Sequence, residues 1–154
     1  MKRIVIMNCI TISLIVILSY ISTPNNQILA NHHLITGFGA VIVFMSVLWI
    51  VSLLVKDASI VDIFWGPAFI VLGSSLLVSM DQVYSERSLF ILFLVSLWAI
   101  RLASHIGFRN IGHGEDFRYV EWRKESGKNY WWHSFIRVFL LQGSLCTLVG
   151  VSIY

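Results

Sequence analysis

The sequence predicts an all-α, polytopic transmembrane helix bundle of about five helices with a cytoplasmic N-terminus. Hydrophobic residues make up 57% of the 154 residues and charged residues only 12%, whereas soluble domains carry about 25% charged residues. The mean hydropathy is +0.80, and the apolar residues gather in runs near the ~20 residues that a spanning helix needs. We expect a single multi-pass domain over residues 1–154, integral to the inner cell membrane.

The apolar runs, in chain order, are Ile4–Ile21, Leu34–Val55, Ala58–Val78, Leu89–Phe108 and Trp131–Tyr154. The first run follows Lys2 and Arg3, as the core of a signal peptide does. Because this run is long and no Ala-x-Ala cleavage site follows it, we expect an uncleaved helix instead.

Short polar connections separate the apolar runs. Pro24–Asn26 predicts the first turn. Only Lys56 and Asp57 separate the second and third runs, so these two helices are expected to form a tight antiparallel pair. Asp81–Arg87 forms the next short loop, and Phe108–Tyr130 is predicted to be a long loop.

With the N-terminus inside, nearly all basic residues between the spans lie on the cytoplasmic side. They are Lys2, Arg3, Lys56, Arg109, Arg118, Arg123, Lys124 and Lys128, against Arg87 outside. This bias sets the orientation of membrane proteins. Because the net charge of +3 comes from residues that flank the spans, we expect membrane lipids as partners and no nucleic acid.

The cysteine and histidine spacing predicts neither a disulfide framework nor a metal site. Cys9 and Cys146 both fall in apolar runs, as small buried residues do. His113 and His133 have no metal-ligand spacing with any cysteine or acid.

Polar side chains within three of the predicted helices lie at a similar depth. They are Asp62 with Trp65, Arg101 with His105, and His133 with Arg137, all in the cytoplasmic leaflet on this topology. A charge inside a membrane helix costs about 2.5–3.5 kcal/mol on insertion scales, so such residues suggest a functional site. We predict a polar cavity that opens to the cytoplasm.

Trp98, Arg101, His105 and Arg109 follow the spacing i, i+3, i+7, i+11, which places them on one helical face. Such a face suits an anionic ligand, because the arginine fork donates two parallel hydrogen bonds to phosphate. Alternatively, Arg101 extends toward the interface, Arg109 already lies there, and His105 packs as an ordinary core residue.

The segment from Gly112 to Arg118 combines flexible backbone with charge. Glu115 and Asp116 can accept hydrogen bonds from ribose or amide groups, and Arg118 can hold a phosphate. The alternative is a solvated loop with exposed ion pairs worth about 0–1 kcal/mol each. Asp62 can cap its helix, pair with Arg101 or donate a proton. The amide of Gln142 needs a partner, either another helix or a substrate.

Four motifs resemble those of a known family. Val61–Trp65, Leu97–Leu102, Gly114–Tyr119 and Phe139–Gly143 are similar, in order and spacing, to successive motifs of a bacterial membrane family of unknown function in the steroid 5-alpha-reductase-like superfamily. The resemblance covers about Ser59 to Gly143. It implies a membrane reductase that uses NADPH to reduce the C=C bond of a lipophilic enone, sterol or other lipid-like substrate.

The same resemblance implies roles for individual residues. Asp62 and Tyr119 are expected to be catalytic; Arg101, His105, Arg109, Glu115, Asp116, Arg118 and Arg137 are expected to bind the cofactor; Trp65, Trp98 and Gln142 are expected to contact the substrate. A 2′-phosphate cofactor generally requires arginine, which fits this set.

Two alternatives stay open. The superfamily includes membrane methyltransferases that act on isoprenylated cysteine with S-adenosylmethionine, and a non-catalytic membrane protein would also carry apolar helices. Family members usually run well beyond this length. The chain is therefore expected to be the N-terminal part of a longer reductase-like domain, whose later helices complete the cofactor site.

Overall fold

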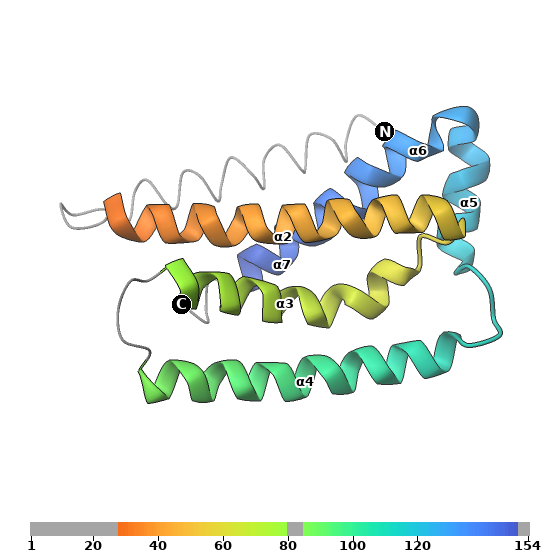
Figure 1. Cartoon of the computed structure of the whole chain (residues 1–154). Helices are drawn as coiled ribbons and strands as arrows, with labels where there is room; N and C mark the ends of the chain where they lie inside the picture. The colour runs from red at the N-terminus through yellow and green to blue at the C-terminus, as the bar shows by residue number, and fades with distance from the viewer. Residues whose placement is uncertain (1–27, 80–84, 151–154) are drawn as a thin grey trace.

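The structure, a computed structural model, describes residues 28–79 and 85–150 (Figure 1). Within these two ranges every regular element is helical, which confirms the predicted all-α class. The elements are α2 (Ile28–Val55), α3 (Ile60–Ser79), α4 (Glu86–Asn110), α5 (Phe117–Ser126), a three-ten turn η1 (Gly127–Asn129), α6 (Tyr130–Ser134), a π-helical stretch η2 (Phe135–Leu140) and α7 (Leu141–Gly150). The predicted first helix, Ile4–Ile21, lies outside the described residues.

Four helical stretches are long and apolar enough to cross a membrane, namely His32–Val55, Ile60–Ser79, Glu86–Asn110 and Phe117–Gly150. Each overlaps one of the predicted apolar runs, so the multi-pass membrane class is confirmed. The α4 helix begins three residues before the predicted run, because Ser85 caps it by accepting a hydrogen bond from the backbone N–H of Ser88.

Helix α3 lies at the centre of the bundle. It packs against α2 and α4, its antiparallel neighbours, and against α7. Helix α5 lies across one end of the bundle, where α4 leaves it and the chain turns back toward α6 and α7 (Figure 1). This end holds the turn at residues 56–59 and the loop at residues 111–116, and we call it the loop end.

Glycines allow the helices to approach closely, as is common in membrane bundles. A Cβ atom added to Gly66 of α3 would lie 3.0 Å from the backbone carbonyl oxygen of Ala99 in α4. A Cβ atom on Gly143 of α7 would lie 3.2 Å from the Met45 side chain in α2. The two contacts fix where α4 and α7 cross their neighbours.

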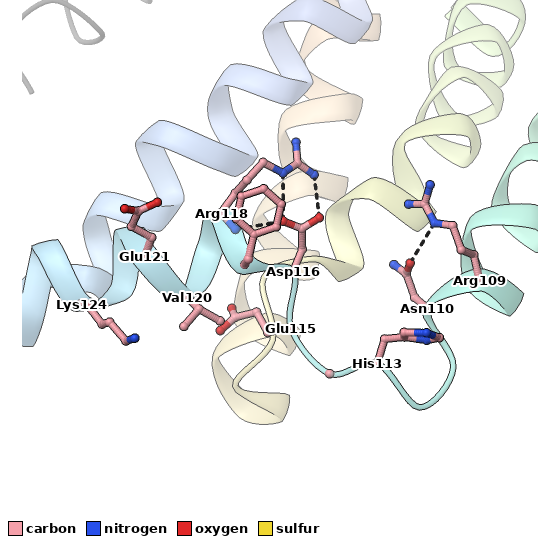
Figure 2. A pocket seen from close by; sticks show the side chains of 11 residues that line it. Arg109, Asn110, His113, Glu115, Asp116, Arg118, Val120, Glu121 and Lys124 are labelled. Atoms are coloured by element: carbon pink, nitrogen blue, oxygen red, sulfur yellow. Dashed lines mark hydrogen bonds and ion pairs between the residues drawn. The ribbon is translucent and has the colours of Figure 1, made fainter.

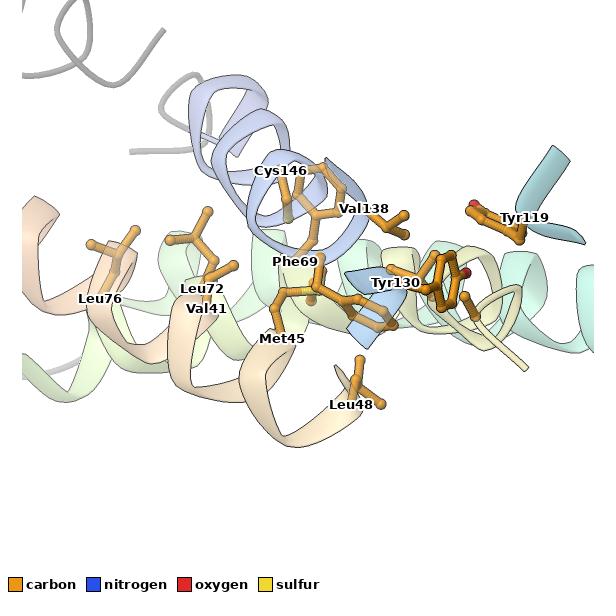
Figure 3. Packing of buried hydrophobic residues seen from close by; sticks show 14 residues of the cluster. Val41, Met45, Leu48, Phe69, Leu72, Leu76, Tyr119, Tyr130, Val138 and Cys146 are labelled. Carbon is orange, nitrogen blue, oxygen red and sulfur yellow. The ribbon is translucent and has the colours of Figure 1, made fainter. Parts of the chain in front are cut away.

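Apolar side chains from α2, α3, η2 and α7 fill the space between these helices (Figure 3). The buried set includes Val41, Met45, Leu48, Phe69, Leu72, Val138, Phe139 and Cys146. The same cluster continues to the loop end through two buried tyrosines, Tyr119 of α5 and Tyr130 of α6. The core therefore holds α5 against the bundle.

The predicted long loop, Phe108–Tyr130, is wrong in its central part, because that part is helix α5. Asp116 starts the helix by accepting a hydrogen bond from the Arg118 backbone N–H at 3.0 Å. Gly127 follows its last residue with a positive φ of 52°. The high charge of the segment suggested a loop, but its Tyr119 side chain is buried in the core.

We predict that Gly66→Ala destabilises the bundle and that Gly39→Ala does not. The new methyl group at position 66 meets the Ala99 backbone, which cannot move without separating α3 from α4, and overpacking costs about 1–3 kcal/mol. At position 39, also within a helix, an added Cβ meets nothing within 4 Å. Thermal unfolding of both variants in the same detergent measures the difference, and equal melting temperatures would contradict the close crossing.

Candidate functional site

Asp62 lies in the first turn of α3, at the loop end, and both of its carboxylate oxygens are hydrogen-bonded by α5. The Tyr119 hydroxyl donates to Oδ1 at 3.0 Å. The Arg118 guanidinium donates to Oδ2 at 3.2 Å. The Asp62 side chain is 21% exposed, and the Tyr119 residue is buried. This contact joins two elements that lie more than fifty residues apart in the chain.

Arg118 also binds the carboxylate of Asp116 through two parallel hydrogen bonds (Figure 2). Its Nε donates to Oδ1 at 3.0 Å and its Nη2 to Oδ2 at 3.1 Å. These bonds lower the pKa of Asp116 below its ordinary value. The Arg118 guanidinium also lies 5.4 Å from the centre of the Tyr119 ring. Arg118 therefore links two carboxylates to the catalytic candidate Tyr119.

Glu115 joins the loop to the turn between α2 and α3. Its carboxylate accepts a hydrogen bond from the backbone N–H of Ala58 at 2.8 Å and two from Arg123 at 2.7 and 3.1 Å. Arg123 also donates to the carbonyl oxygen of Lys56 at 3.2 Å and lies 4.2 Å from the centre of the Tyr130 ring. The sequence did not predict this role of Arg123, because Lys56 and Arg123 lie 67 residues apart in the chain.

A pocket of about 1080 Å³ opens beside this network (Figure 2). It is lined by Arg109, Asn110, His113, Gly114, Glu115, Asp116, Phe117, Arg118, Val120, Glu121 and Lys124. This volume slightly exceeds the ~300–1,000 Å³ range of small-molecule sites. In the described part of the chain no carboxylate pairs with Arg109 or Lys124. These two cations are therefore available to an anionic ligand.

A second, smaller pocket of about 320 Å³ lies on the side of α4 and is lined by Trp98, Arg101, Leu102 and His105. The predicted common face of Trp98, Arg101 and His105 is therefore confirmed. Arg109, predicted to share it, lines the larger pocket instead.

The pairing of Asp62 with Arg101 that we considered from the sequence is wrong, because Arg118 and Tyr119 bind Asp62. Ala99 is the residue of α4 that faces α3, as its close approach to Gly66 shows. Arg101 comes two positions later, about 200° around the helix. Its side chain therefore points away from α3.

Three aromatic rings connect α3 to the smaller pocket. The ring centres of Trp65 and Phe69 are 5.2 Å apart, and that of Trp98 lies 5.6 Å from Phe69 and 6.5 Å from Trp65. The indole nitrogen of Trp65 is buried, and no hydrogen-bond partner for it lies among the residues described. Because Asp62 precedes Trp65 by about one turn, the aromatic rings lie next to the Asp62 network.

Arg137, in the π-helical stretch η2, lies away from both pockets. Its guanidinium is 4.9 Å from the centre of the Trp122 ring, and Nη1 is 3.7 Å from the carboxylate of Glu125. Its Nε and the Nε2 of His133 are buried without a hydrogen-bond partner within the described ranges. Gln142 is half-buried in α7. The ligand-binding roles of Arg137 and Gln142 stay predictions.

The structure thus brings four of the predicted site residues into one network, namely Asp62, Asp116, Arg118 and Tyr119. It does not bring Arg101, His105 or Arg137 into that network, so the prediction that the polar side chains of three helices share one cavity is wrong for these residues. In residues 28–79 and 85–150, no three His, Cys, Asp or Glu side chains are placed to share a metal ion.

Residues 48–154 match the model of a protein family of unknown function, DUF1295. The match includes α3, α4, α5 and both pockets, and it covers more than half of the chain. No curated protein and no solved structure matches the chain.

We predict that Tyr119→Phe destabilises the protein and that Tyr130→Phe does not. Both tyrosines are buried, at 3% and 6% exposure. Removing the Tyr119 hydroxyl takes a hydrogen bond from the Asp62 carboxylate, and such bonds to charged groups are worth about 1.5–3 kcal/mol. The Tyr130 hydroxyl has no partner among the described residues, so its loss removes no bond there. Denaturant unfolding in mixed micelles compares the two variants, and an equal loss in both would contradict the Asp62–Tyr119 contact.

Proposed function

We propose that this chain, which belongs to the DUF1295 family, is a membrane-embedded reductase, or part of one, that uses NADPH to reduce the C=C bond of a lipophilic enone. The observation that carries the proposal is the Asp62–Tyr119 hydrogen bond, joined through Arg118 to a large pocket that contains two cations without a carboxylate partner among the described residues. The motif resemblance to the steroid 5-alpha-reductase-like superfamily supports the reaction class.

Charge supports a cytoplasmic location for the loop end, where NADPH is present. Six basic residues lie at this end in the described part of the chain: Lys56, Arg109, Arg118, Arg123, Lys124 and Lys128. Arg87, at the start of α4, lies at the other end. By the positive-inside rule, the loop end of a protein in a bacterial inner membrane then faces the cytoplasm.

The larger pocket contains groups that suit NADPH. Arg109 and Lys124 are exposed cations, and each can bind a phosphate without first breaking an ion pair. Arg118, Asp116 and Glu115 are already bonded within the protein, so their part in the site is to shape it. NADPH, when bound, supplies a hydride to the β-carbon of the substrate double bond.

The Asp62–Tyr119 pair can deliver the proton that the reduction also requires. With Asp62 ionised, the Tyr119 hydroxyl donates its hydrogen to Oδ1. With Asp62 protonated, Oδ1–H donates to the phenol oxygen, and the phenol hydrogen becomes available to a substrate carbonyl. Transfer of this hydrogen to the substrate is followed by transfer of the Asp62 proton to Tyr119. Arg118 then stabilises the ionised carboxylate through Oδ2.

The aromatic rings of Trp65 and Trp98 fit the lipophilic part of such a substrate. They lie next to Asp62 on the side of α3 that faces α4, and the unpartnered indole nitrogen of Trp65 can donate a hydrogen bond to a substrate oxygen.

The test is binding of NADPH to the purified full chain in nanodiscs, measured by the fluorescence of the reduced nicotinamide. We expect saturable binding, weakened about tenfold or more by Arg109→Gln combined with Lys124→Gln, since loss of a charge-assisted hydrogen bond costs about 1.5–3 kcal/mol. Arg87→Gln, an arginine at the other end of α4, is the control and should bind as the natural chain does.

Two results would contradict the proposal. Saturable binding of S-adenosylmethionine that NADPH does not displace would favour a methyltransferase. Binding of neither compound would favour a non-catalytic membrane protein.

A further inference from the structure

We infer that the smaller pocket on α4, lined by Trp98, Arg101, Leu102 and His105, binds the anionic head of a membrane lipid. This site is separate from the larger pocket that we assign to NADPH, and the inference does not depend on reductase activity. The ligand is a phosphate- or carboxylate-headed lipid of the leaflet at the loop end.

The first argument is depth. Arg101 precedes Asn110, the last residue of α4, by nine positions, or about 13–14 Å at 1.5 Å per residue. Helix α4 has 25 residues, about 37 Å at 1.5 Å per residue, so it is longer than the ~30 Å hydrocarbon core of a bilayer. With both ends of α4 beyond that core, the backbone of Arg101 lies among the acyl chains, and its long side chain extends toward the headgroup level. A cation at that level needs a polar partner.

The second argument is that the protein offers no such partner among the described residues. Arg118, Arg123 and Arg137 each lie near a carboxylate, but no hydrogen bond or ion pair there engages Arg101 or His105. The α4 helix contains a single acid, Glu86, in its first turn at the opposite end. The missing negative charge must therefore come from outside the described part of the chain, and an anionic ligand at the pocket supplies it.

The third argument is the chemistry of the pocket. The guanidinium fork of Arg101 suits the two oxygens of a phosphate or a carboxylate, and His105 adds a second donor one turn away. Trp98 is held in place by Phe69 and Trp65, so its ring forms a fixed wall. A volume of about 320 Å³ accommodates a headgroup and the start of an acyl chain.

The fourth argument concerns the source of the anion. Beyond the pocket, toward the middle of the membrane, α4 exposes Leu94, Leu97 and Ile100. An acyl chain attached to a head at Arg101 would continue along these apolar side chains. Among the described elements, α4 packs mainly on α3, and no other described helix packs closely on it. The surface therefore fits an amphiphile better than a soluble anion.

The experiment is native mass spectrometry of the full chain in detergent with added phosphatidylglycerol or phosphatidylcholine. We expect one phosphatidylglycerol to be retained by the natural chain and by Arg87→Gln, an exposed arginine of the same helix. Retention should fall about tenfold in Arg101→Gln, which removes the charge, and less in Arg101→Lys, which keeps the charge but loses the fork. Phosphatidylcholine should be retained weakly by all four proteins.

A second readout locates the lipid. Phosphatidylglycerol with brominated chains should quench part of the tryptophan fluorescence, and Trp98→Phe should abolish that part. This measurement does not depend on the stability of the Arg101 variants.

Three results would overturn the inference. Equal retention by Arg101→Gln and Arg87→Gln would mean that Arg101 simply extends to the interface and binds no specific lipid. Displacement of the lipid by inorganic phosphate would identify the ligand as a soluble anion. Stoichiometric displacement by NADPH would place Arg101 in the cofactor site, as the motif resemblance implies.

Discussion

The arrangement of the loop end depends on one constraint, the need to bond both oxygens of a carboxylate at the start of a membrane helix. Asp62 stands in the first turn of α3 beside apolar residues, where an unpaired charge is costly. Tyr119 and Arg118 supply the donors, and both come from α5. Helix α5 must therefore lie across the end of the bundle, although its own sequence is rich in charge.

The other charges at this end divide into two groups. Glu115 forms an ion pair with Arg123, and Asp116 forms one with Arg118. These bonds fix the loop and the start of α5. Arg109, Lys124 and Arg101 have no carboxylate partner in the described ranges. Glu115 and Asp116 thus hold the structure, while Arg109, Lys124 and Arg101, like Glu121 in the larger pocket, have no ion-pair partner within those ranges. The three cations without a carboxylate partner among the described residues support the two proposals, a phosphate-bearing cofactor at the larger pocket and an anionic lipid at the smaller one.

Sequence patterns predicted the features that depend on a single helix. They failed for features that depend on contacts with another part of the chain. Hydropathy predicted the second, third and fourth membrane helices within a few residues, and spacing predicted the shared face of Trp98, Arg101 and His105. The partner of Asp62 could not be predicted from the sequence, because it depends on how α4 crosses α3. The close approach of Gly66 to Ala99 fixes this crossing, and the Arg101 side chain then points away from α3. Helix α5 was missed because its stability comes from the Asp116 cap and the burial of Tyr119, neither of which hydropathy measures.

The most direct test of this account is a double-mutant cycle between Asp62→Asn and Tyr119→Phe, with the free energy of unfolding measured in the same micelles for all four proteins. Residues in direct contact show coupling energies of about 0.5–3 kcal/mol. The account predicts a coupling in the upper part of that range, because the bond involves a buried phenol and a carboxylate. Additive effects of the two substitutions would show that α5 is not held to α3 through Asp62, and the proposed proton path would lose its basis.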